Sequence, residues 1–332
     1  MKLSRFHRIA AVGCLVAVGL AACGSDDNGS TSAGSTPAAG GDATNSGLTI
    51  AMITHEVPGD TYWDIVKAGA NEAAKQHGID LKYSSDPDFT KQAVLVQNAI
   101  DSGVDGIALT AAGPSALGDV VKAANAAKIP VVMFDSGIDD WKALGALMYF
   151  GSDEYLGGVA LGDRIGAAGG KHILCVIHQE GSVALEARCK GAKESKGGAT
   201  SENMQVNGAD DASVNASITA KLQQDPSIDW IVTMGAPVAL VSLEAIKTAG
   251  SAAKVATFDL NVAAAQAIKD GTIVMAVDAQ PYAQGYEAVD SLWLYNTNGN
   301  DLGGGGPVLT GPSIVDATNI DKILPFAQNG TR

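Results

Sequence analysis

Residues 104–135 read VDGIALTAAGPSALGDVVKAANAAKIPVVMFD. Two apolar runs, 106–110 and 130–134, flank a segment at 114–127 that has the composition and length of a helix. Both runs are apolar on successive residues, which is typical of strands that are buried on both faces of a sheet. A strand, a helix and a second strand in this order predict one unit of a parallel sheet.

The same alternation continues on both sides of this unit. The other expected strands are 48–54, 79–84, 172–177, 205–206, 230–233, 255–258 and 273–277. The other expected helices are 62–77, 90–102, 155–168, 184–193, 212–224, 238–249, 262–270 and 282–296. These are too many strands for one comfortable sheet, so we expect an α/β fold of two doubly wound parallel-sheet lobes. Ligands bind beyond the C-terminal ends of such strands, which directs attention to 55–63, Asp135, Ser136 and Asp259.

The first 22 residues have the pattern of a signal peptide. Lys2, Arg5 and Arg8 precede an apolar run at 9–20, which is too short to span a bilayer comfortably. The run ends in Leu-Ala-Ala-Cys-Gly at 20–24, which resembles a lipobox. We therefore expect Cys23 to be lipidated and to become the mature N-terminus. An ordinary signal peptide with a chance cysteine is the alternative.

Residues 24–47 are almost wholly Gly, Ser, Thr, Ala, Asp and Asn. Such a composition cannot form a core, so 23–47 is interpreted as the lipidated cysteine followed by a flexible tether. Of the four cysteines, Cys14 leaves with the signal peptide and Cys23 carries the lipid. Cys175 and Cys189 remain as an even pair in an oxidising compartment, which predicts a disulfide. Two buried thiols are the alternative.

Charge and motifs exclude several function classes. The net charge of −14 argues against a nucleic-acid partner, because phosphate binding needs a basic face. The segment Gly169-Gly170-Lys171-His172 is not a phosphate-binding loop, because Ile165 stands where the first Gly should be. No nucleophile elbow, zinc-protease motif or dinucleotide fingerprint is found. We therefore expect no enzyme activity, no metal and no cofactor.

Five segments carry a resemblance to a known family. They are Tyr62-Trp63-x4-Lys67-x-Gly69-Ala70, Ile129-Pro130-Val131-Val132-x2-Asp135, Ser152-Asp153-Glu154-x2-Gly157-Gly158, Gly181-x6-Arg188 and Thr248-Ala249-Gly250-x7-Phe258-Asp259. In their order and spacing over 48–323 the chain resembles the ribose-binding family of type I solute-binding proteins. The resemblance implies two lobes that are joined by three hinge strands and close on a ligand. It assigns 48–151 with 280–310 to the N-terminal lobe, and 152–279 with 311–332 to the C-terminal lobe.

The resemblance also implies a set of ligand-binding residues. Carboxylates and Arg form charge-assisted hydrogen bonds to hydroxyl groups, and aromatic rings cover the C–H faces of a sugar. The expected substrate-binding residues are His55, Asp60, Tyr62, Trp63, Asp135, Ser136, Arg188, Gly235, Asp259 and Gln280. Helix capping is the alternative role for Asp60, core packing for Trp63, and a structural role for His55.

Departures from the family pattern put ribose itself in doubt. Ser136 replaces a second cleft Arg, Gly235 stands where ribose binders carry Asn, and Ala209 stands where they carry Phe. Ala279 stands where they carry Gln, and the neighbouring Gln280 is expected to compensate. These changes favour a small neutral polyol or a differently shaped sugar.

The sequence thus predicts a lipid-anchored, extracytoplasmic substrate-binding protein of an ABC importer. The expected ligand is a small neutral monosaccharide or sugar alcohol, and the expected partners are the importer's membrane permease and the membrane itself. We expect the protein to be a monomer. A module that presents its ligand to a membrane receptor uses the same fold and is the alternative.

Overall fold

The computed structural model describes residues 45–332. The expected signal peptide, the lipidated Cys23 and most of the expected tether lie outside these residues. The tether's last residues contact the fold: the backbone N–H of Ser46 donates to the carbonyl of His77 (3.2 Å) and its hydroxyl donates to the carbonyl of Gly78 (3.2 Å). Within the described part of the chain, no helix is both long and apolar enough to cross a membrane.

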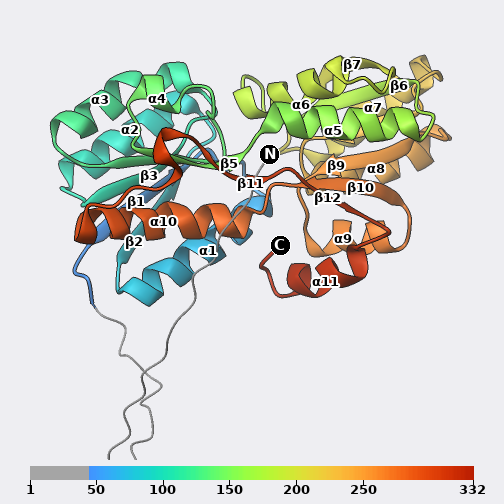
Figure 1. Ribbon diagram of the computed structural model, residues 1–332. Helices are drawn as coiled ribbons and strands as arrows, with labels where there is room; N and C mark the ends of the chain where they lie inside the picture. The colour runs from blue at the N-terminus through green and yellow to red at the C-terminus, as the bar shows by residue number, and fades with distance from the viewer. Residues whose placement is uncertain (1–44) are drawn as a thin grey trace, which may run out of the picture. The chain divides into compact units, whose positions relative to one another are not determined.

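The strands form two six-stranded sheets (Figure 1). The first has the order β11-β5-β4-β3-β1-β2, and all its neighbouring pairs are parallel. The second has the order β12-β10-β9-β8-β6-β7, and only β12 is antiparallel to its neighbour. The strands of the first sheet are β1 Thr49–Thr54, β2 Asp80–Ser85, β3 Gly106–Thr110, β4 Val131–Phe134, β5 Met148–Ser152 and β11 Val308–Gly311. Those of the second are β6 His172–Ile177, β7 Thr200–Gln205, β8 Trp230–Thr233, β9 Lys254–Phe258, β10 Ile273–Asp278 and β12 Ser313–Asp316.

Helices cover both faces of each sheet, which gives the two doubly wound lobes that the sequence predicts. The helices of the first lobe are α1 Tyr62–His77, α2 Phe89–Asp101, α3 Gly118–Ala126, α4 Trp141–Leu144 and α10 Pro281–Asn298. Those of the second are α5 Glu154–Ala167, α6 Val183–Glu194, α7 Asp211–Gln224, α8 Ala236–Ala249, α9 Val262–Lys269 and α11 Ile320–Gln328. Two short 3₁₀ turns complete the set, Pro114–Ala116 and Gly303–Gly305.

The chain passes between the sheets three times: after β5, between β10 and α10, and between β11 and β12 (Figure 1). The third crossing contains a cis peptide bond at Gly311-Pro312. Each lobe is therefore built from separate stretches of sequence, and β11 completes the first sheet after the chain has already made most of the second.

In each lobe two helices approach closely through a reciprocal pair of glycines. In the first lobe a Cβ on Gly69 of α1 would lie 2.0 Å from the carbonyl O of Tyr282, and a Cβ on Gly285 of α10 would lie 2.0 Å from that of Val66. In the second lobe Gly158 of α5 and Gly191 of α6 have the same relation. No side chain fits at these positions, so the helices can pack this closely only because all four residues are glycines.

Several boundaries differ from the sequence expectation. The strand expected at 205–206 runs over Thr200–Gln205, which is polar and half exposed at the edge of its sheet and so lacks an apolar signal. The helix expected at 114–127 is a 3₁₀ turn followed by α3. Strands β5, β11 and β12 and helices α4 and α11 were not expected as elements.

Candidate functional site

The candidate site is a cavity between the C-terminal ends of the strands of both sheets, here called the inner cavity. Its lining comprises His55, Val57, Asp60, Tyr62, Trp63, Asp135 and Ser136 from the first lobe, and His178, Gln179, Ser182, Ala184, Leu185, Arg188, Met234 and Asp259 from the second. Eight of the ten predicted substrate-binding residues thus meet at one place. The exceptions are Gly235 and Gln280.

The two aspartates occupy equivalent positions in the two lobes. Asp135 follows β4 with a φ of 64°, and Asp259 follows β9 with a φ of 63°. Their backbone N–H groups donate to the neighbouring strands, at Phe150 O (2.9 Å) and Val277 O (2.8 Å). Left-handed backbone at a non-glycine residue costs free energy and persists where the surrounding structure enforces it, commonly at functional sites.

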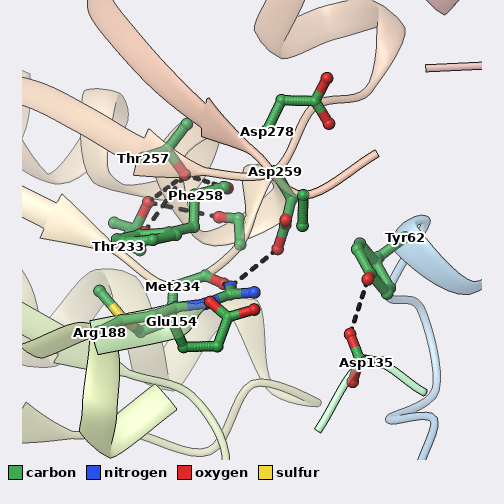
Figure 2. A network of polar contacts seen from close by, with 12 residues as sticks. Tyr62, Asp135, Glu154, Arg188, Thr233, Met234, Thr257, Phe258, Asp259 and Asp278 are labelled. Atoms are coloured by element: carbon green, nitrogen blue, oxygen red, sulfur yellow. Dashed lines mark hydrogen bonds and ion pairs between the residues drawn. The ribbon is translucent and has the colours of Figure 1, made fainter. Parts of the chain in front are cut away.

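On the first lobe, Asp135 is held by hydroxyl donors. The Tyr62 hydroxyl donates to its Oδ1 (2.6 Å) and the Ser136 hydroxyl to its Oδ2 (2.8 Å), and Figure 2 shows the tyrosine contact. The ring of Tyr62 lies edge-on to that of Trp63, with 5.1 Å between centroids. Both rings are almost fully buried, and both line the cavity. The hydroxyl of Tyr62 is thus oriented by its hydrogen bond to Asp135.

His55 lies beside this group. Its Nδ1 is 2.7 Å from Thr110 Oγ1, and its Nε2 is 3.9 Å from Asp135 Oδ2. Burial lowers the pKa of His55 to about 4, against the opposing effect of the nearby Asp135 carboxylate. The imidazole is therefore neutral at neutral pH.

Asp60 begins the first turn before α1, where it caps the helix start and also faces the cavity. Its Oδ1 accepts from the backbone N–H of Tyr62 (3.0 Å), as a helix-capping residue does, and the side chain also lines the cavity. Burial raises the pKa of Asp60 to about 6, and the nearby Asp135 adds to the rise.

On the second lobe, Arg188 joins two carboxylates (Figure 2). Its Nη1 donates to Asp259 Oδ2 (2.9 Å) and to the carbonyl of Met234 (2.9 Å), and its Nε donates to Glu154. The guanidinium also lies 4.6 Å from the centroid of the Phe258 ring. Burial raises the pKa of the Asp259 carboxyl, and the Arg188 charge opposes that rise. The cation is thus already neutralised by the protein.

Several buried polar atoms have no protein partner. They include the carboxylate acceptors Oδ1 of Asp259 and Oε1 of Glu154, and Nδ1 of His178, which donates or accepts according to the tautomer. The hydroxyl of Ser182 is likewise buried without a partner. Because an unpaired buried polar group costs free energy, partners for these groups are expected from a ligand or from water.

Two predicted residues lie outside the inner cavity. Gly235 precedes α8 and lines a neighbouring outer cavity with Val57, Pro58, Asp60, His178, Gly208 and Ala209. Gln280 lies at the second crossing between the sheets, where its side-chain amide donates to the carbonyl of Thr310 and its Oε1 accepts from Arg332. It joins segments at the crossings between the sheets and lines neither the inner nor the outer cavity.

Sequence reasoning missed three polar residues that line the cavity, His178, Gln179 and Ser182, and also Glu154, which contacts Arg188. His178 and Gln179 directly follow β6, so the rule that selected Asp135 and Asp259 would have found them. Glu154 stands in a motif that was recognised, but its pairing with Arg188 joins residues 34 apart in sequence and has no local signal.

The predicted disulfide between Cys175 and Cys189 is present. It joins β6 to α6, the helix that carries Arg188. A second polar cluster, His172, Glu202 and Asp225, has its potential metal-ligand atoms within 4.8 Å of one another. It lies at the opposite end of β6 from His178, and Lys221 already pairs with Glu202 (2.8 Å).

The fold and this two-sided cavity are those of a periplasmic binding protein. A family model described as a periplasmic binding protein domain matches residues 50–300. The chain therefore belongs to this family, within the ribose-binding-like type I solute-binding proteins, and these are not enzymes.

Known proteins agree with this assignment. One is the solved structure of a carbohydrate transporter from Acidothermus cellulolyticus, in complex with myo-inositol. Its sequence is 53% identical to this chain, and the two structures superpose with a TM-score of 0.85. The match covers 86% of this chain and 99% of the transporter chain. The ribose import binding protein of Salmonella typhimurium is 25% identical over 74% of this chain and 84% of its own length. That of Bacillus subtilis is 26% identical over 68% of this chain and 74% of its own length.

Proposed function

We propose that this chain is the extracytoplasmic substrate-binding protein of an ABC importer and that it captures a small neutral monosaccharide or sugar alcohol in the cleft between its two closing lobes, which contains the inner and the outer cavity. The observation that carries the proposal is the set of buried polar atoms of cavity-lining residues that have no protein partner: Asp259 Oδ1, His178 Nδ1 and Ser182 Oγ. A ligand hydroxyl group can both donate to and accept from such atoms, and it needs no counter-charge. The 53% identity to a structure in complex with myo-inositol supports the same ligand class.

Charge argues against amino acids and other ligands that carry a carboxylate. Arg188 is the single Lys or Arg among the described residues that line the inner cavity, and Glu154 and Asp259 already hold it. A ligand carboxylate would have to displace one of them and leave that carboxylate buried without its partner. A neutral polyol can instead accept from the remaining guanidinium N–H groups and donate to the free carboxylate oxygens.

Ligand capture is proposed to require both lobes. Asp60, Tyr62, Trp63 and Asp135 come from one lobe and Arg188 and Asp259 from the other, so neither lobe alone presents a full set of partners. A ligand that contacts both lobes stabilises the closed state selectively. The domain boundaries near 151, 280 and 311 coincide with the three crossings, where the hinge motion is proposed to occur.

A thermal-shift and calorimetry screen tests the proposed ligand class. The panel is myo-inositol, D-ribose, D-arabinose, D-allose, several amino acids and divalent metal ions. A ligand at 100 times its Kd should stabilise the protein by about 2.7 kcal/mol. Binding of one sugar or polyol per chain is expected. Stabilisation by amino acids or metals alone would reject the proposal.

The lipid anchor is proposed on the lipobox at 20–24. Mass spectrometry of protein extracted from the cell envelope should find a diacylglyceryl group on Cys23 and no residues before it. Cys23→Ser should release the protein from the membrane fraction without changing ligand affinity. An unmodified N-terminus at another residue would contradict the anchor and leave the ligand proposal untouched.

A further inference from the structure

His178 lies at the boundary between the inner and the outer cavity and lines both. It directly follows β6 of the second lobe, and its Nε2 is 4.0 Å from Asp60 Oδ2 of the first lobe. Its side chain is 10% exposed, and its Nδ1 is buried without a protein partner. The ring therefore lies between the lobes and has a hydrogen-bonding atom that no protein group uses.

Two glycines make room for this ring. A Cβ on Gly235 would lie 3.2 Å from His178 Cε1, and a Cβ on Gly208 would lie 2.9 Å from His178 Cβ. The backbone of Gly235 is extended, with a φ of −164°, which any residue can adopt. Space for the imidazole, rather than backbone conformation, is therefore what requires a small residue at position 235.

The imidazole is suited to hydroxyl groups. Burial, together with the nearby charge of Arg188, lowers the pKa of His178 to about 4. At neutral pH the ring is therefore uncharged, with one nitrogen as donor and the other as acceptor. Asp60 faces it with a carboxyl group that accepts hydrogen bonds. A hydroxyl group between them would meet both a donor and an acceptor.

We propose that His178 contacts the ligand and determines specificity, reading with Asp60 the configuration of one hydroxyl group, while Gly235 and Gly208 position the imidazole. This inference rests on the proposed sugar or polyol function and adds a residue and a role to it. In the ribose-binding pattern a side chain at position 235 is expected to contact the ligand. In this chain the imidazole of His178, which follows β6, lies beside position 235.

The test measures both affinity and stereochemical preference. Calorimetry gives the Kd of wild type, His178→Ala and His178→Gln for pairs that differ at one hydroxyl: myo-inositol with scyllo-inositol, D-ribose with D-arabinose, and D-allose with D-glucose. Loss of a buried hydrogen-bonding group should weaken the preferred ligand by about 5-fold to 100-fold. The preference within at least one pair should also shrink, which a purely structural role would not cause. His172→Ala, at the other end of β6, is the control and should change neither quantity.

A double-mutant cycle tests the role of Gly235. Gly235→Ala in wild type should weaken binding, because the added methyl group pushes the ring away from its position. In the His178→Ala background the same change should alter Kd by less than about 2-fold, because no ring remains to be displaced. Equal losses in both backgrounds would show that Gly235 acts independently of His178.

The outcomes separate the inference from the function on which it rests. If wild type binds no sugar or polyol of the panel, the proposed function fails. If wild type binds and His178→Ala and His178→Gln keep both the Kd and the preference within each pair, the inference alone is overturned. Melting temperatures without ligand identify any variant that has lost its fold. If His178→Ala has lost its fold, the Kd and the preference of the conservative variant His178→Gln test the inference.

Discussion

The guanidinium of Arg188 donates at the same time to Glu154, to Asp259 and to the carbonyl of Met234. The side chains of Arg188, Glu154 and Asp259 are almost fully buried. Removing one partner of such a group leaves buried charge uncompensated, which costs more than the intact group contributes. The residue predicted as a ligand contact is therefore also a structural centre of the second lobe.

Arg188→Ala is therefore expected to affect the fold as well as binding. The free energy of unfolding should fall by about 3–5 kcal/mol, because Glu154 and Asp259 lose their common partner. Chemical denaturation without ligand measures this. Arg164→Ala is the matched control, because its pair with Asp316 is half exposed and should contribute about 0–1 kcal/mol. Equal losses in the two variants would contradict the structural role of Arg188.

The neutral His55 makes stability depend on pH. Its pKa in the folded protein is about 4, below the ordinary value of 6.5, so the unfolded chain binds more protons between these values. Stability from this group is thus fully present above pH 6.5 and is lost as the pH falls through about 4. Asp60, whose pKa is raised to about 6, acts in the opposite sense over the lower part of this window.

His55→Gln isolates the histidine contribution. Between pH 7 and pH 5 wild type should lose about 2 kcal/mol more stability than the variant, because the variant has no imidazole to protonate. Denaturation curves at the two pH values give the loss of unfolding free energy in each protein. Because Asp60 is present in both proteins, its effect cancels in the comparison. The same pH dependence in both proteins would show that His55 is not held neutral.

Sequence predicted the site residues well where a general rule applied to them. Asp135 and Asp259 follow apolar strands, and parallel strands end at one edge of a sheet, so their convergence could be expected. The position of Gln280 could not, because it depends on how Thr310 and Arg332, far along the chain, meet at a crossing. Pairings between distant elements have no signature in a single sequence.

At the scale of elements, the packing of α5 against α6 determines where Arg188 lies. A Cβ on Gly158 would approach the carbonyl O of Arg188 to 2.1 Å, so α6 would have to move. The disulfide between β6 and α6 restrains the same helix from its other side. Closing a loop of this length contributes about 3 kcal/mol in the chain-entropy model.

Gly158→Ala should therefore lower both stability and ligand affinity. Overpacking of this kind costs about 1–3 kcal/mol of unfolding free energy. Displacement of Arg188 should weaken binding by about tenfold, the effect of one lost hydrogen bond. Gly166→Ala is the matched control, because it lies on the same helix and would contact Gly197 rather than Arg188. It should destabilise the fold and leave the affinity unchanged; equal affinity losses would contradict the argument.

Element types were predictable where burial left an apolar signal. The strands β1, β3, β6 and β8 were found nearly to the residue because both their faces are covered. Strand β7, at a sheet edge and half exposed, was mostly missed. Strands β11 and β12 were missed because they are partly exposed, whereas β5 was missed although it is fully buried.

At the scale of the whole molecule, direct contacts join the two lobes around the inner cavity. Asn261 Nδ2 donates to Thr61 Oγ1 (3.1 Å), Gln179 Nε2 to the carbonyl of His55 (3.3 Å), and the backbone N–H of Val183 to the carbonyl of Ala112 (3.0 Å). These hydrogen bonds can form only when the lobes are together. They are therefore expected to contribute to the free energy of closure.

Thr61→Val tests this contribution without disturbing the helix start. Thr61 precedes α1 but its side chain makes no capping hydrogen bond, so the variant loses only the contact across the lobes. The apparent affinity should fall by about 5-fold, since about 1 kcal/mol of closure energy is lost. The unfolding free energy without ligand should stay within about 0.5 kcal/mol of wild type.

Small-angle scattering checks the closure itself. The radius of gyration of wild type should fall when ligand is added, because the ligand selects the closed state. A radius that stays the same, together with unchanged affinity in Thr61→Val, would show that binding does not require the lobes to close.

The three crossings also constrain when the protein can fold. The first sheet lacks its edge strand until residue 311 has been made, and the second lacks β12 and α11 until residue 328 has been made. Neither lobe can be completed from the first half of the chain, so a nascent chain cannot finish one lobe before starting the other. This order delays completion of both sheets until the segment after the third crossing has been synthesised.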